Sequence, residues 1–144
     1  MAWKMRHIGQ FMCLIILAGM LISLSSYETC AAERLIEEIR FEKTSPHKET
    51  VLFKLNGFYP PEVFGMEGEK NRVVCDFYDT GIEKNIEHRI NTGGEIVLRI
   101  RIGIHIAAES KTRVVLNLAS HKNFDVQLRF FEQENIFAIT ITGD

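Results

Sequence analysis

Two arginines with the spacing of a β-strand are the residues of this sequence best suited to bind a ligand. Arg99 and Arg101 alternate with apolar residues of the segment 96–102, so both guanidinium groups should project from one exposed strand face. Two such groups lie about 6–7 Å apart along a strand, and each can bind a carboxylate through paired hydrogen bonds. The pattern predicts a site for carboxylate-bearing ligands. The alternative is that both arginines pair with nearby acids such as Glu38 or Glu95 and only keep the face soluble.

Aromatic side chains offer a second route to a ligand, since a flat ring stacks on the apolar face of a sugar. Tyr59 lies beside Pro60-Pro61, and Tyr78 should face opposite to Phe77 on its strand. We count both tyrosines as candidate binding residues. The alternative is that rings in these segments anchor loops or fill the ends of the core.

Three further charged residues belong to predicted strands. Arg72 and Arg113 begin their strands, and Asp76 lies further along the first of them. We expect these arginines to bridge to acids across the sheet, with Asp76 as a candidate partner, which makes their role structural.

Residue types that serve in catalysis are present without the arrangement that catalysis needs. His47, His88, His105 and His121 are scattered singly, and zinc requires three or four His, Cys or carboxylate ligands on a rigid frame. Neither a Gly-x-Ser-x-Gly turn nor a phosphate-binding loop with its Lys occurs. The sequence therefore predicts no catalytic residue, no metal and no cofactor.

Short runs of alternating apolar and polar residues follow one another after residue 33, and they predict half-buried β-strands. Turn residues separate the runs, among them Asn56-Gly57, Pro60-Pro61 and Gly93-Gly94, and no stretch sustains helical periodicity. The residues expected to face the core are Val51, Phe53 and Leu55; Val73, Cys75 and Phe77; Ile96, Leu98, Ile100 and Ile102; Val114, Leu116 and Leu118; Val126, Leu128 and Phe130; and Phe137, Ile139 and Ile141. Short strands of this kind indicate an all-β fold, a β-sandwich.

An internal duplication appears when residues 35–78 are aligned with residues 96–142. The matching blocks are Ile39-Arg40-Phe41 with Ile100-Arg101-Ile102, Val51 to Leu55 with Val114 to Leu118, Val63 with Val126, and Val73, Cys75 and Phe77 with Phe137, Ile139 and Ile141. Arg40 is thereby the counterpart of Arg101 and a further candidate binding residue. The simplest account is two similar antiparallel β-units, packed face to face with pseudo-twofold symmetry. The polar stretch Asp79 to Glu95 would connect them.

Residues 1–32 have the layout of a secretory signal. Lys4 and Arg6 precede an apolar run over residues 11–24, and Ala31-Ala32 supply a small-residue cleavage site. The alternative is an uncleaved anchor, but 14 apolar residues form a helix of only about 21 Å against a hydrocarbon core of about 30 Å. We therefore expect a signal segment over 1–32 and one domain over 33–144.

Charge and cysteine content agree with an exported, non-nucleic-acid-binding domain. Lys4, Arg6 and Glu28 are the charged residues of the leader, so 15 of the 17 Lys and Arg and 18 of the 19 Asp and Glu remain after it. This acidic balance disfavours nucleic acid as a partner. Cys75 is the single cysteine well inside the domain, so no internal disulfide is expected, and its strand position predicts a small buried apolar residue.

The order of these motifs resembles that of the AMIN domain, a β-sandwich module of exported N-acetylmuramoyl-L-alanine amidases and of pilus and secretion secretins. The resemblance covers about residues 35–142. It is carried by Arg72-Val73-Val74-Cys75-Asp76-Phe77, Ile100-Arg101-Ile102-Gly103 and Arg113-Val114-Val115-Leu116-Asn117-Leu118. It assigns Arg72, Asp76, Gly103 and Arg113 to family motifs. The sequence departs from the family pattern at two places. Asn117 replaces the Asp that is usual in the strand of Arg113 to Leu118, and Glu49-Thr50 occupy the place where an Arg often precedes the equivalent strand of Val51 to Leu55.

The resemblance implies a non-catalytic periplasmic module that attaches to peptidoglycan or to envelope machinery, and we take peptidoglycan as the first reading. A second reading is a protein–protein adaptor subunit of a secretin or type IV pilus assembly. A third is an enzyme that acts on the wall through an unrecognised site. The expected partner is accordingly peptidoglycan or an envelope protein complex, with membrane contact only through the N-terminal segment if it stays uncleaved.

Overall fold

A computed structural model describes residues 33–66, 68, 71–120 and 123–143, which belong to one compact unit beginning at Ala32. The signal segment expected over residues 1–32 lies outside the described residues. Within the described part, no helix has the length and apolar character to cross a membrane.

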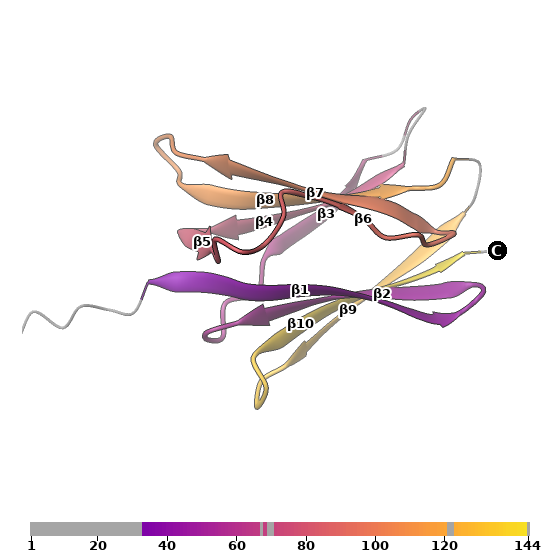
Figure 1. The fold of residues 1–144 in the computed structure, drawn as a ribbon, viewed down its shortest axis with the longest axis horizontal. Coiled ribbons are helices and arrows are strands. Elements are labelled where there is room, and N and C mark those ends of the chain that lie inside the picture. Colours follow the sequence, from indigo (N-terminus) through magenta and orange to yellow (C-terminus); the bar gives the residue numbers. More distant parts are fainter. Residues whose placement is uncertain (1–32, 67, 69–70, 121–122, 144) are drawn as a thin grey trace, which may run out of the picture. The chain divides into compact units, whose positions relative to one another are not determined.

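The described residues form ten β-strands and no helix, in two facing layers (Figure 1). The strands are β1 (Arg34–Ser45), β2 (Lys48–Leu55), β3 (Glu62–Met66), β4 (Arg72–Tyr78), β5 (Thr80–Ile82), β6 (Arg89–Asn91), β7 (Val97–His105), β8 (Lys111–Leu118), β9 (Phe124–Phe131) and β10 (Ile136–Gly143). One five-stranded sheet has the order β5-β1-β2-β10-β9 and the other β3-β4-β8-β7-β6. The predicted all-β sandwich is therefore confirmed, with one parallel pair, β1 with β5, in otherwise antiparallel sheets.

The internal duplication corresponds to two four-stranded halves, β1 to β4 and β7 to β10. The first sheet contains β1-β2-β10-β9 and the second contains β7-β8-β4-β3, which is the same order with the halves exchanged. Each half thus gives one hairpin to each sheet. The two halves exchange strands, because β4 completes the sheet of β8 and β10 completes the sheet of β2.

Strand register reproduces the duplication in every matched block except Val63 with Val126. Ile39 pairs with Phe53 as Ile100 pairs with Leu116, and Arg40 and Arg101 occupy equivalent positions opposite β2 and β8. The match of Val63 with Val126 is two residues out of register. Val63 lies opposite Cys75, and the residue opposite the Cys75 counterpart Ile139 is Leu128.

A β-bulge is repeated in the two halves and changes one predicted side-chain direction. The register shifts between Ile36 and Glu38 in β1 and between Val97 and Arg99 in β7. An extra residue in one strand breaks the alternation there. Leu98, which the alternation predicted to face the core, is therefore 47% exposed, while Val97 is fully buried.

The connection between the halves contains two short edge strands. β5 pairs with β1 and β6 pairs with β7, so the stretch Asp79 to Glu95 extends both sheets instead of only joining them. At its end a buried carboxylate fixes the start of β7. Glu49, fully buried on β2, accepts the backbone N–H groups of Glu95 (2.7 Å), Ile96 (3.1 Å) and Val97 (2.7 Å).

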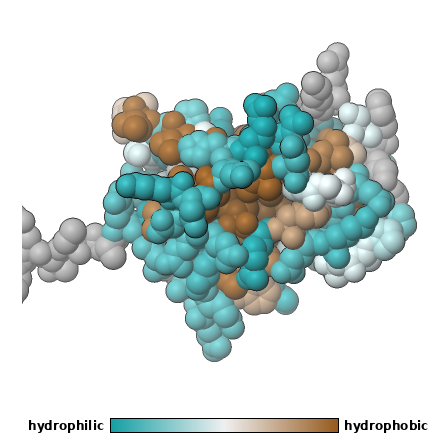
Figure 2. All heavy atoms as spheres, in the orientation of Figure 1, coloured by the Kyte–Doolittle hydropathy of each residue, from teal (hydrophilic) through white to brown (hydrophobic). Residues whose placement is uncertain are grey.

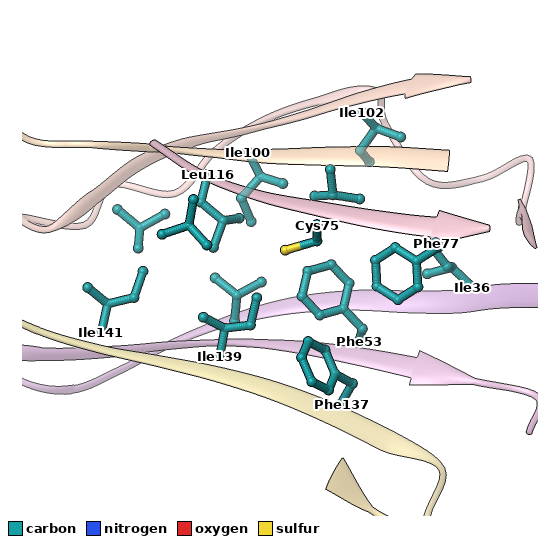
Figure 3. Packing of buried hydrophobic residues seen from close by; sticks show 14 of the residues in the cluster. Ile36, Phe53, Cys75, Phe77, Ile100, Ile102, Leu116, Phe137, Ile139 and Ile141 are labelled. Carbon is teal, nitrogen blue, oxygen red and sulfur yellow. The ribbon is translucent and has the colours of Figure 1, made fainter. Parts of the chain in front are cut away.

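The core lies between the layers and is formed by the inward faces of both sheets (Figure 3). Phe53 of β2 contacts Phe77 of β4, with 5.2 Å between ring centroids, and Phe137 of β10 at 6.1 Å. Cys75 is fully buried among them, as predicted, and burial raises the pKa of its thiol.

The edge strand β9 departs from the predicted burial. Val126 and Leu128 have core-facing positions but are 38% and 50% exposed. Phe130 is covered by Phe58, whose ring centroid lies 4.6 Å away, and Phe131 is 39% exposed. Successive residues of a strand point to opposite faces, so the two phenylalanines cannot both face inward.

Candidate functional site

The outward-facing side chains of β3, β4, β8, β7 and β6 form one surface, which we call the cationic face; it covers the upper layer in Figure 1. Its charged members are the cations Arg72, Arg89, Arg99, Arg101, Lys111 and Arg113 and the carboxylates Glu62 and Asp76. The face therefore has an excess of four positive charges on a chain whose formal net charge is −2. Such a patch attracts anionic ligands.

In the half of the face over β3, β4 and β8, Arg113 and Lys111 form ion pairs with Asp76. Arg113 donates Nε and Nη2 to the two oxygens of Asp76, both at 2.7 Å, and Lys111 Nζ lies 2.9 Å from Asp76 Oδ2. The hydrogen bonds from Arg113 are the main reason why the pKa of Asp76 falls to about 2, despite its burial. The predicted partnership of Arg113 with Asp76 is confirmed. Arg113, Lys111 and Asp76 are therefore bound to one another.

Tyr78 belongs to the same closed network. Its hydroxyl donates to Glu62 Oε2 at 2.9 Å, which raises the pKa of Tyr78, and Lys111 Nζ lies 5.1 Å from its ring centroid. Arg113 stacks in the same way over Phe64, at 5.7 Å. The ring of Tyr78 lies on the cationic face but already has a cation over it.

The other half of the face, over β7 and β6, holds arginines with neutral partners or none. Arg99 Nε donates to Asn91 Oδ1 at 3.0 Å, and Arg101 Nε donates to Asn117 Oδ1 at 2.9 Å. Arg89 lies opposite Arg101 and has no side-chain hydrogen bond or ion pair with any described residue. Of the acids considered as partners from sequence, Glu38 lies 3.5 Å from Arg40 and Glu95 lies 2.5 Å from Lys43. The hydrogen bonds of Arg99 and Arg101 end on neutral amide oxygens instead.

A shallow hollow of about 430 Å³ lies among these side chains. Its lining consists of His88, Arg89, Arg101, Ile102, Gly103, His105, Arg113 and Val115. Gly103 leaves space because it has no side chain between Arg101 and His105; a Cβ there would already lie 3.5 Å from His105 Nε2. A family-motif glycine thus helps to form a concave site whose walls carry guanidinium groups.

The counterpart position on the other sheet lacks this excess. Arg40 is equivalent to Arg101, and Glu38 occupies the position equivalent to Arg99. Arg40 Nε lies 3.5 Å from Glu38 Oε1, so this pair contains one positive and one negative charge where Arg99 and Arg101 carry two positive charges. Arg40 lies on the opposite outer face of the sandwich and is not brought together with Arg99 and Arg101.

Tyr59 also lies outside the cationic face, in the loop between β2 and β3. Its hydroxyl accepts the backbone N–H of Leu35 at 2.9 Å and lies 3.0 Å from the Leu35 carbonyl oxygen, which it reaches as a donor. Arg34 stacks on its ring at 5.4 Å. These contacts anchor the start of β1 to the loop. The geometry of Tyr59 therefore fits the alternative stated above, in which its ring anchors a loop.

Arg72 differs from the expectation that it would bridge to an acid. It lies opposite Asn117 and Met66 at the end of the sheet, and its Nε is buried without a hydrogen-bond partner among the described residues. No three His, Cys, Asp or Glu side chains within the described ranges are close enough to hold a metal ion.

Arg89, Asn91 and Asn117 were not identified from the sequence as parts of a site. Arg89 and Asn91 flank Ile90 in a strand of three residues, too short for an alternation to be recognised. Asn117 was visible only as a departure from the family pattern. Its position opposite Arg99 and beside Arg101 requires the register of β7 on β8.

Comparison with known families settles the relationship suggested by the motifs. The sequence model of the AMIN domain matches residues 38–141, which span β1 to β10. The chain belongs to the AMIN domain family. AMIN domains are periplasmic, non-catalytic modules of amidases and secretins that bind or target peptidoglycan. No curated protein and no solved structure matches the chain.

Proposed function

We propose that this AMIN protein is exported by residues 1–32 and that residues 33–144 bind peptidoglycan without chemically altering it. The binding surface is the half of the cationic face over β7 and β6. The observation that carries the proposal is that Arg89 and Arg101 line a hollow, beside which Arg99 and Arg101 bond to neutral amide oxygens. Guanidinium groups in this state retain donors for the carboxylates of cell-wall peptides.

The test is sedimentation of residues 33–144 with isolated peptidoglycan sacculi at low and high salt. We expect binding that weakens with salt, because exposed charges are screened over a Debye length of about 8–10 Å. The variant Arg99→Ala with Arg101→Ala should remain in the supernatant while keeping the melting temperature of the parent. A large fall in melting temperature would instead assign these arginines to stability.

Arg40→Ala is the matched control, because Arg40 occupies the equivalent strand position on the other sheet and is paired with Glu38. It should bind sacculi like the parent. Equal loss of binding in both variants would show that overall charge, and not this face, governs sedimentation. Absence of binding by the parent at both salt concentrations would overturn the proposal.

A protein–protein adaptor role in a secretin or pilus assembly is the second candidate. It is favoured by the end of the β7–β8 hairpin, where Figure 2 shows hydrophobic atoms on the surface. Ile104 and Ile106 in this region are 50% and 90% exposed. Exposed apolar residues of this size mark contact sites when they cluster. Crosslinking in the envelope, with Ile106→Ser as the variant, tests this role independently of sacculi.

A further inference from the structure

Among the described residues, no strand pairs with the outer edge of β9. It pairs with β10 on one side and lies at the border of its sheet on the other (Figure 1). Every second residue of this eight-residue strand therefore directs its backbone N–H and C=O groups away from β10. Val126 and Leu128 on its core-facing side remain 38% and 50% exposed. A long edge of this kind is a template for pairing with another strand.

The sequence of β9 is complementary to itself in the antiparallel direction. Around Gln127 it has Val126 and Leu128, then Asp125 and Arg129, then a phenylalanine at each end, Phe124 and Phe130. If a second copy of β9 pairs antiparallel about a twofold axis at Gln127, Asp125 of each copy lies opposite Arg129 of the other. Val126 of each copy then lies opposite Leu128 of the other. Both residues are on the core-facing side of the strand, where they are partly exposed in the single chain.

Asp125 and Arg129 have no ionic partner among the described residues. Asp125 lies opposite Thr142 and accepts a hydrogen bond from Gln127 Nε2 at 3.1 Å. Arg129 lies opposite Ala138 and stacks over Phe131 at 5.4 Å. Neither forms a salt bridge with a described residue, whereas opposite charges placed directly across two strands attract.

The corresponding edge strand of the other sheet lacks these properties. β3 has five residues, and its one charged side chain, Glu62, already accepts the hydroxyl of Tyr78. Self-pairing of β3 would bring no opposite charges together. β3 therefore lacks the complementarity that β9 has.

We propose that the free edge of β9 is a self-association surface, on which a second copy of this chain docks antiparallel about Gln127. Two five-stranded sheets then form one continuous sheet across the dimer, and the paired edges cover Val126 and Leu128. A single strand pair buries less surface than the about 1,200–2,000 Å² of a stable interface. The dimer should therefore be reversible and dissociate on dilution.

Analytical ultracentrifugation of residues 33–144 over about a hundredfold range of concentration tests association. These residues are suitable because every described strand and core residue lies within them. We expect a monomer–dimer equilibrium. Arg129→Asp and Asp125→Arg should each be monomeric throughout, since each places like charges opposite one another. Both should keep the parent's melting temperature because the two side chains are exposed.

Restoration of opposite charges provides the decisive control. The double variant Asp125→Arg with Arg129→Asp should dimerise like the parent, and an equimolar mixture of the two single variants should form heterodimers. A monomeric parent at all concentrations, or single variants that dimerise normally, would overturn the proposal. Failure of both restorations would overturn the register.

Cysteine crosslinking tests the register directly. Gln127→Cys places two cysteines opposite one another at the twofold axis, within the Cα separation of about 4.4–6.8 Å that a disulfide needs. Asp125→Cys is the control, because its two copies lie about 13 Å apart along the paired strands. We expect a disulfide-linked dimer from Gln127→Cys alone, and equal crosslinking of both variants would contradict the pairing. The native Cys75 is buried and does not interfere.

Discussion

Arg113 holds Asp76 through two parallel hydrogen bonds, from Nε to Oδ1 and from Nη2 to Oδ2, each 2.7 Å long. The pair joins β8 to β4, which come from different halves of the chain. It therefore stabilises the pairing of β4 with β8, the contact by which the two halves share one sheet.

This pair gives stability that depends on pH. The pKa of Asp76 is lowered from 3.8 to about 2 in the folded protein, chiefly by Arg113. A carboxyl with a lowered folded pKa contributes its stability above the unfolded pKa and loses it as pH falls through the folded pKa. We expect urea unfolding to show that Asp76 contributes about 2 kcal/mol more near pH 5 than near pH 2.

Asp76→Asn is the variant that isolates this contribution. The difference in unfolding free energy between parent and variant should shrink as pH is lowered across this window. A constant difference between about pH 5 and pH 2 would contradict the lowered pKa.

Gly94 should not tolerate a side chain. A Cβ at this position would lie 2.5 Å from Glu49 Oε2 and 2.7 Å from Phe41 Cζ. We expect Gly94→Ala to lower the unfolding free energy by about 1–3 kcal/mol. Gly65→Ala is the control, since a Cβ there meets nothing within 4 Å. Equal stability of the two variants in chemical denaturation would contradict the close packing.

Glu49 should be essential as a carboxylate because it accepts three backbone N–H groups in a buried place. In Glu49→Gln the amide nitrogen cannot accept, so at least one N–H loses its partner, at a cost of about 1–3 kcal/mol. The exposed Glu42→Gln on β1 should be close to neutral in the same thermal unfolding measurement. An unchanged stability of Glu49→Gln would show that another group accepts the backbone N–H groups at the start of β7.

Cys75→Ser should destabilise the domain by about 1–3 kcal/mol, because a hydroxyl replaces an apolar sulfur in the core. In the parent, the same thiol should resist labelling reagents until the protein unfolds, since it is fully buried and burial raises its pKa. Rapid labelling under native conditions would contradict the inward position of the thiol.

The sequence allowed the inward faces of most strands to be predicted, because alternation is a local property. It did not reveal the bulge that exposes Leu98, since the extra residue of a bulge is recognised only against the partner strand. The outward direction of Arg99 and Arg101 followed from the same alternation. Their partners did not, because Asn91 and Asn117 come from neighbouring strands whose register the sequence leaves open.

The exchange of hairpins between the halves governs how the chain can fold. β2 acquires its second neighbour only when β10 is present, although the two strands are separated by most of the chain. Pairings between distant segments form slowly because a long loop must close before they contribute. A nascent or truncated chain lacking residues 136–143 therefore has an unfinished sheet. The last strand determines when the molecule becomes a cooperative folding unit.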